Sequence, residues 1–278
     1  RLDTDKDRIE SHLDDINDAI DEGHSRLIDE IDDLTDEDTP LFKDISAENE
    51  RLGSGTVVSC QNLGPIQADF QGGGIVGTIG LESALDPDDD IEFLGETSIR
   101  MNRYVSAYVL NSKNKGSVTV QNDDAGGIAG VAWFGILKGN ENYGDIETTD
   151  GDYCGGIAGE SQAVIQNNYN KSIMTGNSFL GGIAGKGKTV TENYSMAQLF
   201  FDDGRYIGNL AGDLYEDAAV YGNHYVKNGY GAVNNITFRS QAAGTSYEEF
   251  MALQDMPEEF KKMTVTFLAD DEIVEQIV

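Results

Sequence analysis

The chain of 278 residues has little cysteine, histidine and proline. Two cysteines, Cys60 and Cys154, are too few for a disulfide scaffold and lack metal-ligand spacing, so we expect two buried thiols, with a bridge between them as the less favoured alternative. Three histidines, with no GxSxG or Cys/His arrangement in suitable context, give nucleophilic catalysis no support. No apolar run approaches the roughly 18 residues that a membrane-spanning helix needs, which argues against membrane insertion. The first residue is Arg1, which indicates a fragment of a longer protein.

Positive charge is also scarce. Nineteen lysines and arginines face 50 aspartates and glutamates, which gives a formal net charge of −31. Such a chain repels phosphate backbones and anionic lipid head groups, so we expect no nucleic-acid partner and no membrane-surface partner. We interpret the charge as a solvated surface.

Glycine is abundant, with 33 residues, and it recurs in one phrase. The copies are GGGIVG at 72–77, AGGIAG at 125–130, CGGIAG at 154–159, LGGIAG at 180–185 and IGNLAG at 207–212. Successive steps from Gly126 are 29, 26 and 27 residues, whereas the step from Gly73 to Gly126 is 53. We interpret the longer step as two repeats with one signature lost. A phosphate-binding loop has no reason to recur at this interval.

The repeats predict an all-β fold, because short strands bury an apolar face only by stacking on the next repeat. We expect a parallel β-solenoid of about six coils, right-handed from chain chirality, with strands roughly 4.8 Å apart. Glycines would form its corners. The apolar residues of the phrase should stack in one aliphatic column: Ile75, Ile128, Ile157, Ile183 and Leu210. A β-sandwich or barrel is the less favoured alternative.

An Asn-Tyr element, looser in the last copy, follows four of the five glycine phrases and contains Tyr143, Tyr169, Tyr194 or Tyr225. Stacked tyrosines beside amides suit sugar rings if they are exposed. In stacked repeats the same residues also form internal ladders, which we favour. The four tyrosines are therefore weak ligand-binding candidates.

The phrase GGIAG followed by an Asn-Tyr element resembles the GLUG-type repeat of bacterial surface and secreted proteins, adhesins among them. The resemblance covers roughly residues 72–228. It implies a non-catalytic structural or adhesive module of a secreted or cell-surface protein. Its partner would be a host or cell-wall glycan or a surface protein.

Two other functions remain open. A glycan- or protein-binding module would need an exposed aromatic or acidic face. A carbohydrate-active β-helix enzyme would need clustered acids in a cleft, but the acids of the repeats vary from copy to copy, so we assign no catalytic residue. The stretch LDPDDDIEF carries a weak candidate calcium site formed by Asp86, Asp88, Asp90 and Glu92, because alternate loop oxygens can converge on a hard cation.

The flanks differ from the repeats. Residues 1–38 form an acidic amphipathic helix whose apolar residues are Ile9, Leu13, Ile16 and Ile20, with Leu27, Ile31 and Leu34 beyond Gly23. Fewer than three uninterrupted heptads do not establish a coiled coil, so the helix either caps the solenoid or ends an oligomeric stalk. The solenoid would span 39–245 and a helix 246–263, opened by a capping box of Ser246 and Glu248. Alternation in 264–278 predicts a hairpin that begins a further β module.

Overall fold

The computed structural model describes residues 12–13, 16–17, 19–20, 22–26, 42–48, 55–81, 91–93, 99–101, 104–202, 204–254, 256–262, 265–269 and 272–277. The chain divides into two compact units, one of residues 1–43 and 86–105 and the other of residues 44–85 and 106–278. In the sequence their boundaries fall within β1 (Lys43–Asp44), after residue 85 and directly after β9 (Tyr104–Val105).

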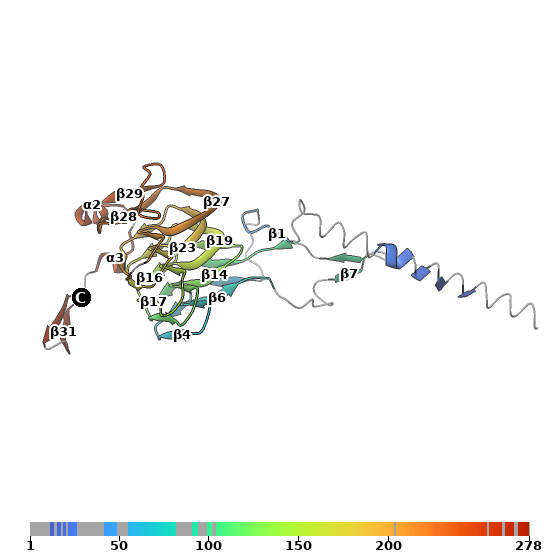
Figure 1. The fold of residues 1–278 in the computed structure, drawn as a ribbon, viewed down its shortest axis with the longest axis horizontal. Coiled ribbons are helices and arrows are strands. Elements are labelled where there is room, and N and C mark those ends of the chain that lie inside the picture. The colour runs from blue at the N-terminus through green and yellow to red at the C-terminus, as the bar shows by residue number, and fades with distance from the viewer. Residues whose placement is uncertain are drawn as a thin grey trace, which may run out of the picture. The chain divides into compact units, whose positions relative to one another are not determined.

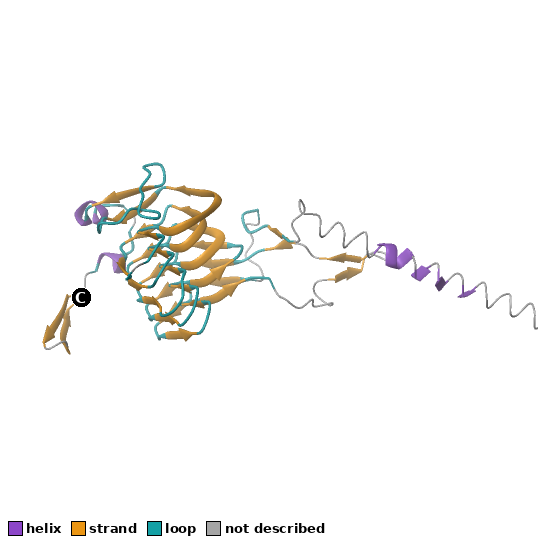
Figure 2. Ribbon diagram, in the orientation of Figure 1, coloured by secondary structure: helices purple, strands orange, loops and turns teal. Residues whose placement is uncertain are grey.

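The second unit is built mainly of parallel strands, which confirms the predicted all-β, parallel fold class (Figures 1 and 2). One sheet contains β2 (Thr56–Val58), β6 (Val76–Ile79), β10 (Tyr108–Leu110), β14 (Ala129–Ala132), β15 (Ile136–Lys138), β19 (Ala158–Gln166), β23 (Ala184–Thr191) and β27 (Ala211–Tyr221). A second contains β3 (Gln61–Asn62), β11 (Lys113–Asn114), β16 (Glu141–Asn142), β20 (Tyr169–Asn170), β24 (Tyr194–Ser195), β28 (Asn223–Val226) and β29 (Ala242–Thr245). A third contains β4 (Ile66–Ala68), β12 (Val118–Val120), β17 (Ile146–Thr148), β21 (Ile173–Thr175) and β25 (Gln198–Phe200). The glycine phrases form the fourth: β5 (Gly72–Gly73), β13 (Ala125–Gly126), β18 (Cys154–Gly155), β22 (Leu180–Gly181) and β26 (Ile207–Gly208).

The repeats pair in register, so equivalent residues stack. Gly126 pairs with Gly155, Gly155 with Gly181 and Gly181 with Gly208. The predicted aliphatic column is confirmed: its last four members are fully buried, and Ile75 packs against them half-buried. Continuous burial of one residue per repeat gives the unit its main core.

The prediction that one repeat between Gly73 and Gly126 has lost its signature is wrong. Gly73 pairs directly with Gly126, so the glycine phrase occurs in five neighbouring repeats and none is missing between them. The extra residues form an insertion that leaves the ladder after β6 and returns before β10. It contains the antiparallel pair β7 (Ile91–Phe93) and β8 (Ile99–Met101). A parallel ladder tolerates such an insertion because it adds residues only to the connection between two repeats.

Two columns of asparagine run through the interior. In one, the side-chain amides of Asn140, Asn168, Asn193 and Asn223 bond in sequence at 3.0, 3.0 and 3.1 Å. In the other, Asn62, Asn114, Asn142 and Asn170 bond at 2.8, 2.9 and 2.8 Å. An amide both donates and accepts, so each asparagine satisfies the repeats on both sides of it. Polar groups are thereby buried without loss of hydrogen bonds.

The second glycine of the phrase makes room for this ladder. A Cβ at Gly127 would lie 2.3 Å from Cγ of Asn142, and a Cβ at Gly156 would lie 2.2 Å from Nδ2 of Asn170. These glycines are therefore required by close approach and not by the corner conformation expected from the sequence. The left-handed corner residue precedes the phrase, as at Tyr153 with φ of 62°.

The C-terminal segment packs on the repeats beside Tyr169 and Tyr194. Its helices are α2 (Tyr247–Met251) and α3 (Glu258–Lys261), and Phe250, Met256 and Phe260 form a buried cluster with Tyr169. The capping box opens at Ser246 as predicted, but its partner is Glu249, one residue later than expected. β30 (Val265–Ala269) and β31 (Glu272–Ile277) form the predicted antiparallel hairpin.

In the first unit, all described residues between 12 and 26 are helical and exposed, as predicted for a helix in this region.

Candidate functional site

The four candidate tyrosines do not form one column. Tyr169 pairs with Tyr194 and Tyr194 with His224, so His224 occupies the position that the sequence had suggested for Tyr225. Tyr225 is buried in the main core. Tyr143 lies two residues beyond the strand position that pairs with Tyr169. The supposed equivalence fails because the Asn-Tyr element is shifted between repeats relative to the backbone ladder.

The tyrosine column that does form is covered. The rings of Tyr169 and Tyr194 stack with centres 4.9 Å apart, and His224 stacks on Tyr194 at 5.3 Å. The ring centres of Phe260 and Phe250 lie 5.8 and 6.3 Å from those of Tyr169 and Tyr194, in edge-to-face arrangements. These rings therefore anchor the C-terminal helices and leave little ring surface for a sugar.

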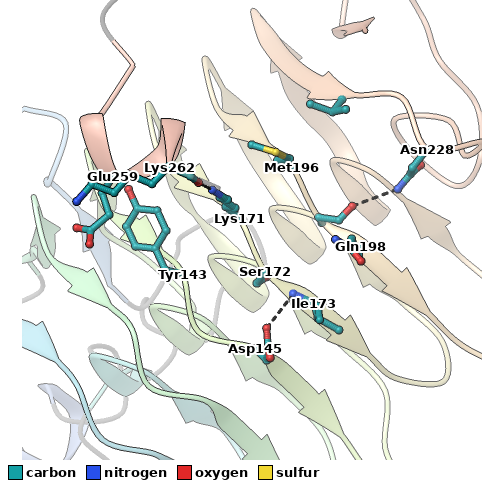
Figure 3. Close-up of a pocket in the computed structure, with 12 residues that line it drawn as sticks. Tyr143, Asp145, Lys171, Ser172, Ile173, Met196, Gln198, Asn228, Glu259 and Lys262 are labelled. Carbon is teal, nitrogen blue, oxygen red and sulfur yellow. Dashed lines mark hydrogen bonds between the residues drawn. The ribbon is translucent and has the colours of Figure 1, made fainter. Parts of the chain in front are cut away.

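A cavity of about 590 Å³ lies beside this anchor and includes Tyr143, Asp145, Lys171 and Glu259 in its lining (Figure 3). Lys171 Nζ donates to the backbone carbonyl of Phe260 at 3.2 Å and to that of Lys262. Asp145 accepts the backbone N–H of Ile173 at 3.0 Å. The ammonium and the carboxylate thus bind backbone groups. The bonds of Lys171 connect α3 to the repeats.

Burial lowers the pKa of Lys171 and raises that of Tyr143, whose hydroxyl also donates to Glu141 Oε2 at 2.5 Å. Both shifts come chiefly from loss of hydration. The pKa of Glu259 is lowered by its 2.5 Å bond to Lys115. Lys171, Tyr143 and Glu259 are thus each held by a hydrogen bond within the chain.

A second aromatic column lies at the left-handed corners. Tyr153, Phe179 and Tyr206 have φ of 62°, 53° and 60°. Their ring centres are 4.5 and 4.6 Å apart, with interplanar angles of 21° and 12°. The sequence carries a signal for this column, since each aromatic residue stands two positions before the first glycine of its phrase.

Tyr206, the last ring of this column, lines a cavity. Tyr206 is 39% exposed, and among the described residues no ring other than Phe179 stacks on it. The cavity has a volume of about 430 Å³, and its lining includes Phe201, Arg205, Tyr206, Tyr230, Asn234 and Asn235. It combines aromatic surface with amide and guanidinium groups.

Acidic residues lie near Tyr153, the first ring of the column. Asp124 is only 8% exposed, and its buried Oδ1 has no hydrogen-bond partner. Burial and the charges of Glu160 and Asp123 raise its pKa to about 7. Glu160 accepts the hydroxyl of Tyr215. Because solvent does not reach the unpartnered oxygen, a substrate does not reach it in this conformation either.

The candidate calcium ligands Asp86, Asp88 and Asp90 lie outside the described residues, and Glu92 belongs to β7. Within the part of the chain that the structure describes, no group of three or more histidine, cysteine or acidic side chains is placed to hold a metal.

Both cysteines are free, as expected, and Cys154 is buried. Cys60 lies between the short strands β2 and β3 and is exposed, contrary to expectation. Among the described helices, none is long and apolar enough to cross a membrane.

No family model, no curated protein and no solved structure matches the chain.

Proposed function

We propose that residues 39–245 form a right-handed parallel β-solenoid that serves as a non-catalytic structural or adhesive spacer in a secreted or cell-surface bacterial protein with GLUG-type repeats. The observation that carries the proposal is the in-register parallel pairing of five consecutive glycine phrases. Repeats that contact mainly their neighbours extend a chain by a constant step, which is the property a spacer needs.

The interior of the repeats supports this role. Aliphatic side chains and the two asparagine ladders fill it, and the ladders bond repeat to repeat. Asp124 is the only acidic residue that is buried in the part of the chain that the structure describes, so the acidic charge there lies mainly on the surface, where it favours solubility. The proposed spacer would therefore present outward-facing residues to partners and keep its interior for stability.

Deletion of residues 156–181 tests the architecture, because it removes one complete 26-residue step. The shortened chain should keep its β circular dichroism and a cooperative unfolding transition. Deletion of residues 156–168 is the control, since half a step breaks the register and should abolish cooperative unfolding. If both deletions unfold the protein, the solenoid proposal is wrong. Release of reducing sugar from polysaccharides by the intact chain would contradict the non-catalytic role.

Glycan binding at the cavity of Tyr206 is a second candidate function. An aromatic ring with one free face stacks on the apolar face of a pyranose, and nearby amides and guanidinium groups bond its hydroxyls. Tyr206 offers such a ring, with Arg205 and Asn235 in the same lining.

Saturation-transfer NMR with oligosaccharides of β-linked glucose, N-acetylglucosamine and galacturonate tests this candidate. Transfer to at least one of them should be lost in Tyr206→Ala and kept in Tyr206→Phe. Tyr221→Ala is a matched control, because Tyr221 is exposed on β27 and is not among the residues that line the cavity. No transfer to any probe at millimolar concentration would sink the idea.

A further inference from the structure

The helix of the first unit exposes an apolar face. Leu13 and Ile16 are each 54% exposed and Ile20 is 62% exposed. Their spacing of three and four residues places them on one side of the helix. An isolated helix of this length is marginal in water, and its stability normally comes from packing of such a face. These three side chains therefore form an apolar face of the helix that is open to association.

The sequence around these residues follows a heptad pattern. With Leu13 and Ile20 at position a, Ile16 and Ile9 fall at position d, and Leu27 falls at the next a. Leucine or isoleucine at a with isoleucine at d disfavours two-stranded coiled coils and favours three or four strands. Gly23, at d, weakens the seam locally.

The charge pattern identifies the partner. Between residues 12 and 26, the positions e and g that flank the seam are His12, Asn17, Ala19, His24 and Arg26. The acids of this stretch all occupy positions b, c and f, away from the seam: Asp14, Asp15, Asp18, Asp21 and Glu22. Glu22 is paired with Arg26 at 2.7 Å.

Identical copies can approach through such a stripe without bringing acids together, although the chain as a whole is strongly acidic. A basic partner would instead be attracted to the outward acidic positions. The stripe thus fits a second copy of this chain better than a basic helix.

We propose that residues 12–26 form the seam of a homo-oligomeric coiled coil of three or four copies of this chain. The oligomer would gather three or four repeat regions at one stalk. This inference does not depend on the function of the repeats.

Analytical ultracentrifugation of the full chain at about 100 µM and 0.15 M salt tests the proposal, because association depends on protomer concentration. The expected mass is three or four times the 30.1 kDa of one chain. Ile16→Asp places a charge in the seam and should reduce the mass to one chain. Ser25→Asp adds the same charge at an outward f position and should leave the mass unchanged.

Circular dichroism distinguishes loss of the seam from global misfolding, since Ile16→Asp should lower the helical signal and keep the β signal. A wild-type chain that is monomeric or dimeric overturns the proposal. So does an oligomer that survives Ile16→Asp.

Discussion

Replacement of Asn142 by alanine should be among the most destabilising single changes in the repeats. The Asn142 side chain is fully buried in the middle of the second asparagine ladder. It accepts from Nδ2 of Asn114 at 2.9 Å and donates to Oδ1 of Asn170 at 2.8 Å. It also donates to the carbonyl of Gly144 at 3.0 Å and accepts its N–H at 3.3 Å.

Alanine removes all four bonds and leaves a cavity. Each hydrogen bond contributes about 1 kcal/mol net, and buried groups left without a partner cost more. Two of the partners keep another bond, because Asn114 also donates to Gly116 and Asn170 also accepts from Ser172. We therefore expect Asn142→Ala to lower the free energy of unfolding by about 3 to 5 kcal/mol.

Urea unfolding followed by circular dichroism measures this loss. Asn177→Ala is the control, because Asn177 is exposed and makes one long bond of 3.3 Å, to Gly151. Its effect should stay within about 0.5 kcal/mol. If Asn142→Ala unfolds within about 0.5 kcal/mol of the wild type at an unchanged urea slope, the ladder does not stabilise the fold as argued.

Three further predictions concern single positions. The pKa of Asp124 near 7 lies above its unfolded value near 4, so the folded state binds the proton more tightly, and stability should fall as the pH rises from about 4 to about 7. We expect the fall to be about 1 to 3 kcal/mol in the wild type and to be absent in Asp124→Asn, as measured by thermal melts between pH 4 and 8. Gly156→Ala should lower the unfolding free energy by 2 kcal/mol or more, roughly, since its Cβ would overlap an asparagine of the ladder, whereas Gly64→Ala meets nothing within 4 Å and should be near neutral in the same urea assay. A thiol reagent should label exposed Cys60 in the folded protein, and burial, which raises the pKa of Cys154, should protect that thiol until the protein unfolds.

The class of fold was predictable because its information is periodic. A column such as Ile128, Ile157 and Ile183 follows directly from the spacing of the glycine phrase, and the structure stacks these residues as expected. The insertion between β6 and β10 was not predictable from spacing, because its length imitates one additional step.

The site was less predictable. Tyr225 and His224 exchange roles through a shift of one residue, and such a shift turns a strand side chain from the surface to the interior. The residue that stacks on Tyr194 therefore depends on the strand pairing, which the spacing of tyrosines in the sequence does not reveal. The corner column of Tyr153, Phe179 and Tyr206 was missed for a different reason. Left-handed corners are expected at glycine and asparagine, so aromatic residues do not predict one.

The energetics of that column indicate where function is to be sought. A bulky residue at positive φ costs about 1 to 2 kcal/mol, so three of them cost several kcal/mol together. Two stacked contacts contribute about 0.5 to 1.5 kcal/mol each, which offsets only part of that cost. Asparagine holds the same conformation at lower cost in Asn111 and Asn167. The repeats therefore accept backbone strain to line up aromatic rings at this corner, and the column ends at the exposed ring of Tyr206. This end is accordingly where a ligand for the repeats should be tested first.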